Sequence, residues 1–364
     1  GKSFDEHNVF HLGDSKNSKL KTFFDEISNN KKIGCFCPMN LPYSDKFSVF
    51  ISDPWSRYKS DKTLSSRLVY AAIEQVVNSN NRFKISFKSI LGLLCLIGIP
   101  KNLEDIRILY ITLISFIKKD RPKLVGYFDY YFIKYSIERS YKNNLDYTLV
   151  FLNGLAHIQH RFLLTSQFVN TNNLNSQVKN QNDGIFEILK IYDLMFKKIL
   201  KKYSDNFEIW IITALSQKIY DKPKIYWRIS NQKEFFKIFF NFIFNSESLM
   251  TRDFKLSCKN DDNFKLIHNF LKEAVIVDEN DKKISKAFGF VDIIEDKKVF
   301  ASFLLDEDKI NKFIKWEDKK INLDNYLEFV AFKNGEHQQE GWAFCNQSSN
   351  IQNVPIWKLS SFIK

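Results

Sequence analysis

The sequence predicts an α/β protein with a mainly parallel central sheet, helices on both faces of that sheet, and a β-rich insertion near the C-terminus. Apolar runs of strand length alternate with segments of helical periodicity along most of the 364 residues. Two of these runs are continuously apolar, as in strands that are buried on both faces of a parallel sheet. In the last third of the chain, strand-like segments are separated by short charged turns instead of helices.

The elements of the first half follow from apolar spacing and from turn residues. Short β-rich runs predict strands at 32–37 and 47–51. Apolar residues at helical spacing then predict helices at 64–77, 103–117 and 123–137. Pro100 and Pro122 lie near the starts of the last two helices, where proline is tolerated.

The second half gives two more buried strands and then the β-rich region. The buried strands are expected at 146–152 and 208–213, with an Asn-rich exposed loop at 170–182 and an amphipathic helix at 185–200 between them. Three further strands are expected at 287–294, 299–304 and 327–332, with hairpin connections at 278–283 and 295–298. We therefore expect an α/β body at 1–250, a β-rich insertion or subdomain at 251–326 and a return to the body at 327–364.

The charge balance favours an anionic ligand. Lys and Arg number 54 against 42 Asp and Glu, which gives a formal net charge of +12. The basic residues are dispersed, and no helix-turn-helix, zinc-finger or ribonucleoprotein motif is visible, so no dedicated nucleic-acid binding is predicted. An anionic small molecule or a phosphate ester on a glycan or lipid would exploit the same positive field.

Cysteine usage and hydropathy bear on the compartment. The five cysteines are odd in number, irregularly spaced and without Cys-x-x-Cys pairs, so we expect reduced thiols in a cytoplasmic protein. The longest apolar stretch, 90–99, is far shorter than the roughly 20 residues that cross a bilayer. No transmembrane segment is therefore predicted, and 90–99 is expected to be a buried core segment.

Histidines follow one of the buried strands and one strand near the C-terminus. Asn153, His157 and His160 come directly after strand 146–152, and histidines three residues apart share one side of a helical turn. His337 lies after strand 327–332, in a loop bounded by Gly335 and Gly341. Imidazole is a common metal ligand, so these residues are candidates for a metal or catalytic site. The alternatives are polar residues at a helix start and a solvated loop histidine.

Several short motifs together resemble the alkaline phosphatase superfamily, in its type I phosphodiesterase and nucleotide pyrophosphatase branch. Asn153 to His157 has the spacing of the family's Asp-x-x-x-His metal motif, with Asn in the Asp position. Gly335-Glu336-His337, followed by Glu340-Gly341, is similar to its late Gly-x-His motif. The stretch from Gly1 to Phe10 and the segments 32–34 and 38–42 resemble the region after the family's nucleophile.

The resemblance implies a metal-dependent hydrolase with one altered metal position. In the family, an Asp-His pair for a second metal follows the strand that corresponds to 208–213, whereas this chain has Leu215, Ser216 and Gln217. The family's nucleophile strand is expected upstream of Gly1, so the catalytic nucleophile is unknown here. The expected cofactor is one zinc-like divalent metal ion, held by His157 and His337 with His160 and Asn153 as neighbours.

Four residues are assigned to substrate binding. Asp53 belongs to an acidic-Pro-aromatic stretch that is similar to one in the family, although a strand-ending turn with a half-buried Trp55 is the alternative. Arg252 can bind a phosphate bidentately, or else form a surface Arg–Asp pair. Ser216 and Gln217 form the polar turn after strand 208–213.

Two readings of the function follow. One is a divergent phosphodiesterase or phosphotransferase that acts on an anionic phosphate or sulfate ester. The other is a catalytically inactive member of the superfamily that binds such a ligand or a partner. A third class, a plain structural or interaction protein whose histidines are incidental, would differ from the first in its metal content.

Overall fold

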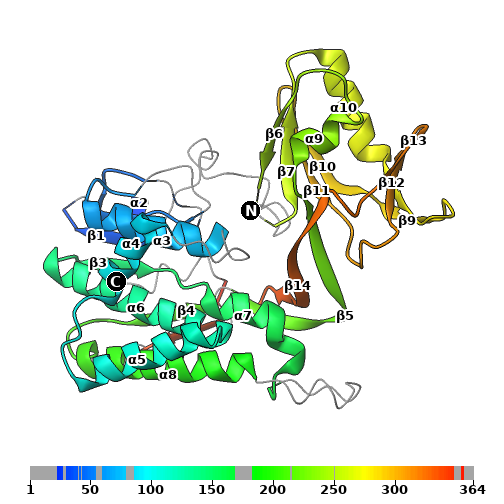
Figure 1. Ribbon diagram of the computed structural model, residues 1–364. Helices are drawn as coiled ribbons and strands as arrows, with labels where there is room; N and C mark the ends of the chain where they lie inside the picture. The colour runs from blue at the N-terminus through cyan, green and yellow to red at the C-terminus, as the bar shows by residue number, and fades with distance from the viewer. Residues whose placement is uncertain are drawn as a thin grey trace. The chain divides into compact units, whose positions relative to one another are not determined.

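The protein is a mixed α/β chain that divides into two compact units. The computed structural model describes residues 23–27, 30–39, 41, 43–54, 60–78, 86–168, 183–213, 215–249, 251–347 and 354–355. Described residues before 220 and after 334 form one unit, here called the helical unit, and residues 220–334 form the other, the β-rich unit. The units are described separately, with the element labels of Figure 1.

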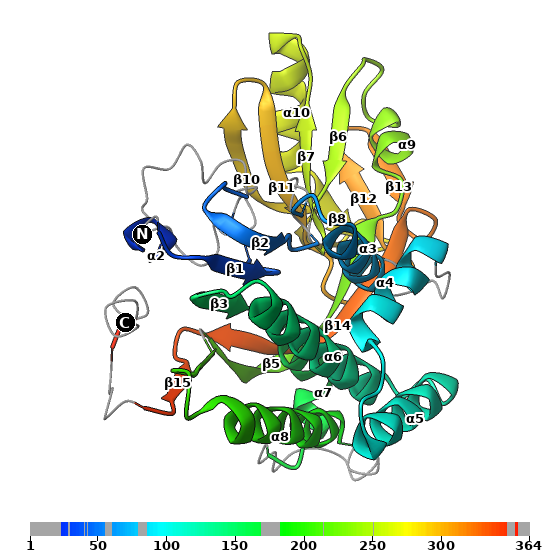
Figure 2. The ribbon, with the colours of Figure 1, turned by 90° about the vertical axis from the view of Figure 1, so that its left-hand side faces the viewer.

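The helical unit contains a three-stranded parallel sheet. Its strands are β1 (Ile33–Phe36), β2 (Phe47–Ile51) and β3 (Tyr147–Val150), in the order β2-β1-β3. Figure 2 shows the three strands side by side. All four residues of the central strand β1 are buried, which agrees with its apolar sequence.

Helices cover one face of this sheet. They are α3 (Leu64–Asn78), α4 (Phe87–Ile97), α5 (Leu103–Ile117), α6 (Arg121–Lys142), α7 (Gly154–Phe162) and α8 (Gly184–Tyr203), with a 3-10 turn at Leu163–Thr165. Phe36, Val49 and Ile51 of the sheet join the apolar core that these helices form. The alternate residues Ile33 and Cys35 lie in a smaller core on the other face. There the described cover is the short helix α2 (Phe23–Glu26) and neighbouring loop residues.

Polar side chains set the starts of the helices. Asn102 accepts a hydrogen bond from the backbone N–H of Asp105 at the start of α5. Asp120 caps α6, whose first turn contains Pro122, and Asp183 caps α8 through the N–H groups of Ile185 and Phe186. Such side chains satisfy N–H groups that have no partner within the helix. These caps explain why the predicted and observed starts of α5, α6 and α8 agree closely.

The remaining strands of the helical unit differ from the predicted arrangement. β4 (Trp210–Thr213) pairs antiparallel with β15 (Trp342–Cys345), and this pair is a sheet of its own. The expectation that 208–213 is a doubly buried strand of the central parallel sheet was therefore wrong. A run of aromatic and β-branched residues indicates a strand, but it does not identify the partner strand.

The β-rich unit holds two four-stranded sheets and a phenylalanine-rich core. One sheet has the order β10-β11-β7-β6, and the other β13-β12-β8-β9; all the strand pairs reported within them are antiparallel. Their strands are β6 (Asn245–Ser248), β7 (Asp253–Ser257), β8 (Val275–Val277), β9 (Lys283–Lys286), β10 (Phe288–Glu295), β11 (Lys298–Phe303), β12 (Phe313–Trp316) and β13 (Lys319–Asn322). Helices α9 (Gln232–Lys237) and α10 (Asp261–Glu273) supply Phe236 and Phe270 to this core.

Two strands carry the chain from one unit to the other. β5 (Ser216–Ile229) and β14 (Leu327–Gln338) pair with each other, and the unit boundaries fall at 219/220 and 334/335 within them. The boundaries expected from the sequence were at 250/251 and 326/327. The predicted hairpins at 278–283 and 295–298 correspond to the antiparallel pairs β8–β9 and β10–β11.

The predicted fold class is thus confirmed at the level of a mixed α/β chain. In the part of the chain that the structure describes, the parallel sheet has only three strands, the long helices lie on one of its faces, and most of the other sheets are antiparallel. Parallel pairing joins only β1 to β2 and β3 among the strand pairs reported for the described residues. The predicted loop at 170–182 lies outside those residues. No helix within the described ranges is both long and apolar enough to cross a bilayer.

Candidate metal centre at the His160–His337 pair

Helix α7 begins directly after β3, at the carboxyl edge of the parallel sheet. Its first residue, Gly154, donates its backbone N–H to the Oδ2 atom of Asp129, which lies on α6, at 3.0 Å. The same oxygen accepts the hydroxyl hydrogen of Tyr192 from α8. A Cβ atom on residue 154 would lie only 2.2 Å from this oxygen, so glycine is required for the close approach of α7 to α6.

The structure brings two of the predicted metal ligands into contact. His160 lies in the second half of α7, and His337 lies near the end of β14, 177 residues later. Their Nε2 atoms are 3.0 Å apart, and their ring centroids are separated by 4.8 Å. Both residues belong to the helical unit. His160 is partly buried and His337 is exposed, so the pair can be reached by a ligand.

A backbone carbonyl group orients the first of these rings. The Nδ1 atom of His160 lies 3.2 Å from the carbonyl oxygen of Gly335. A carbonyl oxygen only accepts hydrogen bonds, so Nδ1 carries the hydrogen and Nε2 of a neutral ring presents its lone pair to His337. A metal-binding histidine is commonly held in this way, with its other nitrogen donating to a carbonyl group or carboxylate.

Strand β5 ties α7 to the end of β14. Gln217 donates its side-chain Nε2–H to the carbonyl oxygen of Ala156 on α7, at 3.2 Å. Ser216 donates its hydroxyl hydrogen to Oε1 of Gln338 at 3.3 Å, and Lys218 forms an ion pair with Glu336 at 2.7 Å. The two residues predicted to bind substrate, Ser216 and Gln217, are therefore next to the elements that carry the histidine pair.

Gln217 also places a polar atom with no partner beside the site. Its Oε1 atom is buried and has no hydrogen-bond donor within the part of the chain that the structure describes. A Cβ atom on Gly335 would lie 3.0 Å from this oxygen and 2.7 Å from Leu163. Gly335 thus allows β14 to pass close to Gln217 while its carbonyl group holds His160.

The donor set fits two positions of a zinc-like ion. Zinc bonds to imidazole nitrogen at about 2.0–2.1 Å, so two ligand nitrogens of one tetrahedral ion lie about 3.3 Å apart. The observed separation of 3.0 Å is close to that value. No group of three or more His, Cys, Asp or Glu side chains with the arrangement of a metal site occurs among the described residues. Further coordination positions would have to be filled by water or by a bound anion.

The two other predicted metal ligands lie at the start of α7. Asn153 is exposed, and its carbonyl oxygen accepts a hydrogen bond from the backbone N–H of His157. Its side chain makes no capping hydrogen bond. His157 is partly buried and precedes His160 by three residues, so the two histidines share one side of α7.

Asp53 belongs to a buried cluster at the carboxyl ends of the parallel strands. It follows β2, Cys37 follows β1, and Asp129 contacts the residue that follows β3 on α7. Burial raises the pKa of Asp129 to about 6, although its hydrogen bonds from Tyr192 and Gly154 lower it. Burial, and then the charges of Asp53 and Asp129, raise the pKa of the Cys37 thiol well above its usual value. Trp55, considered with Asp53 above, lies outside the described residues.

Sequence reasoning missed Asp129 and Tyr192. Asp129 is the one carboxylate in the aromatic stretch Tyr127-Phe128-Asp129-Tyr130-Tyr131 of α6, and a charged residue among buried aromatics is a signal that could have identified it. The partner residue, Tyr192, is 63 positions away on another helix. No local pattern connects these two positions.

Arg252 belongs to the β-rich unit, where it forms an Arg–Asp pair. Its guanidinium group contacts the carboxylate of Asp306 and lies 4.0 Å from the ring centroid of Tyr226. The neighbouring Asp253 is buried and accepts a hydrogen bond from Ser302 instead. An Arg–Asp pair, the alternative considered from the sequence, therefore exists, but its partner is Asp306 and the Arg252 side chain is largely buried.

The segment from Gly1 to Phe10, which contributed to the family resemblance, lies outside the described residues. Comparison of the chain with protein-family models, with curated proteins and with solved structures gives no match.

Proposed function

We propose that this chain binds one zinc-like divalent metal ion through His160 and His337, as a divergent metal-dependent phosphodiesterase or phosphotransferase of the alkaline phosphatase superfamily. The substrate would be an anionic phosphate or sulfate ester. The observation that carries the proposal is the 3.0 Å approach of the two Nε2 atoms, from α7 and from the Gly-x-His segment of β14.

The residues of this chain would prepare the site before a ligand arrives. The Gly335 carbonyl group fixes the ring of His160, so its Nε2 lone pair is already aimed at His337. Gln217 fixes the backbone of α7 one turn earlier, and Ser216 fixes the residue after His337. A divalent ion, when bound there, would supply Lewis acidity toward an ester oxygen and offset its negative charge.

The net charge of the chain supports an anionic substrate. The formal charge of +12 raises the local concentration of anions around the protein and speeds their association. Such attraction is screened by salt, with a Debye length of about 10 Å at 0.1 M ionic strength. Binding of a phosphate ester should therefore weaken as ionic strength rises.

We propose an alkaline phosphatase-like body for the helical unit. The parallel order β2-β1-β3, the covering helices and the start of α7 at the carboxyl edge of β3 support an alkaline phosphatase-like body. All five cysteines are free thiols in the structure. Free thiols are usual in the reducing cytoplasm, so they support the cytoplasmic location expected from the sequence.

A second candidate, a ligand-binding member without catalysis, is favoured by one observation. The position of the family's second metal pair holds Leu215, Ser216 and Gln217, and the side chains of the last two are engaged in hydrogen bonds to Gln338 and Ala156. Such a protein would bind metal and an anion but would not turn over an ester.

Hydrolysis of an aryl phosphodiester, bis-p-nitrophenyl phosphate, by the full-length protein tests the proposal and separates the two candidates. Turnover should require added Zn²⁺ and should be lost in His337→Ala and His160→Ala. It should persist in His268→Ala, which removes a histidine of helix α10 in the β-rich unit. Metal binding without turnover would select the second candidate, and zinc-independent turnover that survives both substitutions would refute the proposal.

A further inference from the structure

Helices α4 and α5 expose an unusually apolar surface. Ten large apolar side chains between residues 87 and 117 are exposed, and Phe87 and Leu103 retain 75% and 86% of their accessible surface. The set, here called the α4–α5 surface, consists of Phe87, Ile90, Leu94, Ile99, Leu103, Ile106, Tyr110, Leu113, Phe116 and Ile117. The stretch 90–99 was expected to be a buried core segment, and this was wrong for Ile90, Leu94 and Ile99. Exposed patches of this kind usually mark an interaction site.

The exposed residues of α5 have the spacing of a single helical stripe. Leu103, Ile106, Tyr110, Leu113 and Ile117 follow one another at intervals of three and four residues, so they share one side of the helix. Ile108 and Ser115 are the buried residues of the opposite side. A helix that is apolar on its outer side as well as its inner side is normally covered on both.

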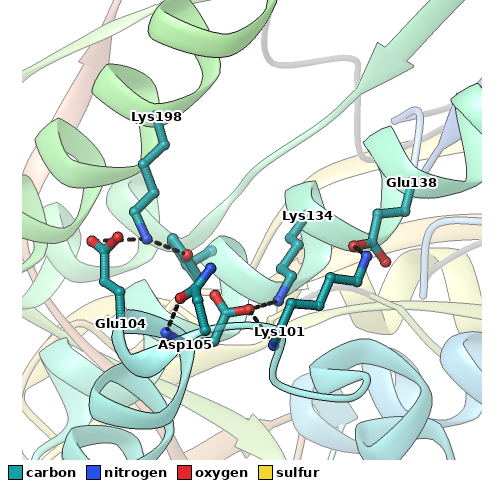
Figure 3. Close-up of polar contacts among 8 residues, drawn as sticks. Lys101, Glu104, Asp105, Lys134, Glu138 and Lys198 are labelled. Atoms are coloured by element: carbon teal, nitrogen blue, oxygen red, sulfur yellow. Dashed lines mark hydrogen bonds and ion pairs between the residues drawn. The ribbon is translucent and has the colours of Figure 1, made fainter.

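Ion pairs hold the start of α5 against its neighbours. Lys134 of α6 pairs with Asp105 at 3.1 Å, and Lys198 of α8 pairs with Glu104 at 3.0 Å (Figure 3). Lys101, just before α5, pairs with Glu138 of α6 at 2.7 Å. These contacts hold the start of α5 against α6 and α8.

The same ion pairs leave the surface with a basic border. From residue 86 to residue 119 there are five basic residues, and both acidic residues, Glu104 and Asp105, are paired with lysines of other helices. The five are Lys88, Lys101, Arg107, Lys118 and Lys119, all exposed. Because Lys101 is paired with Glu138, the basic border is assigned to Lys88, Arg107 and Lys118. An apolar surface with a basic border is complementary to a membrane that contains anionic lipids.

We propose that the α4–α5 surface docks the protein on an anionic lipid bilayer, with the apolar stripe of α5 lying in the interface. The helices contain 11 and 15 residues, too few to cross the hydrocarbon core, and none of the described helices meets the requirements for a span. Phe87, Tyr110 and Phe116 provide aromatic rings of the type enriched at the lipid–water boundary.

The charge distribution favours a bilayer over a second copy of this chain. A two-fold dimer places the same surface of both copies together, so the basic borders of the two copies would face each other. Like charges across an interface oppose association. The docking surface is independent of the histidine pair, so its test does not depend on the proposed function.

Co-sedimentation of the full chain with vesicles tests the proposal. The probes are phosphatidylcholine vesicles and vesicles in which about one lipid in three is phosphatidylglycerol. The variant Leu103→Gln/Ile106→Gln/Leu113→Gln should lower binding to the anionic vesicles at least tenfold. The control Ile243→Gln, at a residue that is 92% exposed in the β-rich unit, should leave binding unchanged.

Two further variants separate the charge effect from the apolar effect and from self-association. Lys88→Glu/Arg107→Glu/Lys118→Glu should abolish the preference for anionic vesicles, and Tyr110→Trp should show blue-shifted emission when vesicles are added. Equal binding of the wild type and the triple glutamine variant would overturn the proposal. So would a dimer in lipid-free solution that the triple glutamine variant converts to a monomer and that does not bind vesicles.

Discussion

The carbonyl oxygen of Gly335 decides which nitrogen of His160 faces His337. It lies 3.2 Å from Nδ1, so the hydrogen of the neutral ring is on Nδ1 and the lone pair is on Nε2. Without a metal ion, the Nε2–H group of His337 can donate to that lone pair. With one, both Nε2 atoms become ligands, and metal binding then competes with protonation of the imidazoles.

Asp129 should make the stability of the helical unit depend on pH. Burial raises its pKa to about 6, from about 3.9 in an unfolded chain. Between these values the folded state keeps a proton that the unfolded state releases, so the free energy of unfolding falls as pH rises through this window. The fall is about 3 kcal/mol for this group and is complete about one unit above the folded pKa, at pH ~7.

Asp129→Asn should remove that dependence, because an amide oxygen can still accept from Gly154 and Tyr192. Urea unfolding at several pH values measures how the free energy of unfolding depends on pH. Asp253→Asn is the matched control in the β-rich unit, since burial also raises the pKa of Asp253 to about 6. An unchanged pH profile in Asp129→Asn would show that the carboxylate does not titrate in this range.

Single residues of the site could be predicted where a local sequence pattern indicated them. His160 and His337 were predicted as site residues because each follows a predicted strand. His337 also lies in a segment bounded by Gly335 and Gly341. The family resemblance predicted that His337 meets His157, with His160 as a neighbour, whereas the contact that the structure shows is between His337 and His160. The hydrogen bond between Gln217 and Ala156 joins positions 61 residues apart, and no sequence pattern indicates it.

The position of α7 should control metal affinity through Gly154. In Gly154→Ala the new Cβ atom would meet Asp129 and Val125, so the start of α7 must shift and carry His160 with it. We expect at least a tenfold loss of Zn²⁺ affinity, measured by calorimetric titration. Gly126→Ala, which crowds Ile188 and Ile191 between α6 and α8, should destabilise the fold while the affinity stays unchanged. Equal losses in both variants would mean that the effect is general destabilisation.

Gly92 allows α3 and α4 to cross closely. A Cβ atom there would lie 2.1 Å from the carbonyl oxygen of Leu68, a backbone atom that cannot rotate away. Gly92→Ala should lower the free energy of unfolding by about 1–3 kcal/mol, because overpacking forces the helices apart. Gly98→Ala meets open space, but its φ of 65° and ψ of −168° lie in a region almost restricted to glycine, so it should cost about 1–3 kcal/mol through the backbone alone. Denaturant titration measures both losses, and unchanged stability in Gly92→Ala would contradict the close crossing.

Element boundaries were predicted better than element partners. The observed ends of β2 and α5 coincide with the predicted ranges, because turn residues and caps mark them locally. The pairing of β4 with β15 depends on residues about 130 positions apart, and β-rich sequence alone cannot specify it. The exposure of Ile90 and Leu94 was not predicted. Apolar content indicates that a segment is covered, but it does not indicate whether the same chain or another molecule covers it.

The division into two units was hidden from the sequence because the chain changes unit within β5 and β14. Neither boundary has a Gly- or Pro-rich linker, since the paired strands continue through it. In the sequence, the β-rich region is marked by strand-like segments with charged turns between them. These segments begin further along the chain than the first unit boundary at 219/220. The predicted limits therefore enclosed a smaller region than the unit that the contacts define.

Two units with separate cores should respond differently to metal. Calorimetry should show two transitions, and Zn²⁺ at about 100 times its dissociation constant should raise only that of the helical unit, by about 5–10 °C. Phe254→Ala, in the core of the β-rich unit, should lower only the other transition. A single transition that moves as a whole would show that the two units unfold together.

The metal content of the purified chain tests most directly the central claim that His160 and His337 form one metal site. Elemental analysis after dialysis against micromolar Zn²⁺ should find one equivalent in the wild type and in His268→Ala, and almost none in His160→Ala or His337→Ala. Equal zinc content in the wild type and in His160→Ala/His337→Ala would contradict the claim.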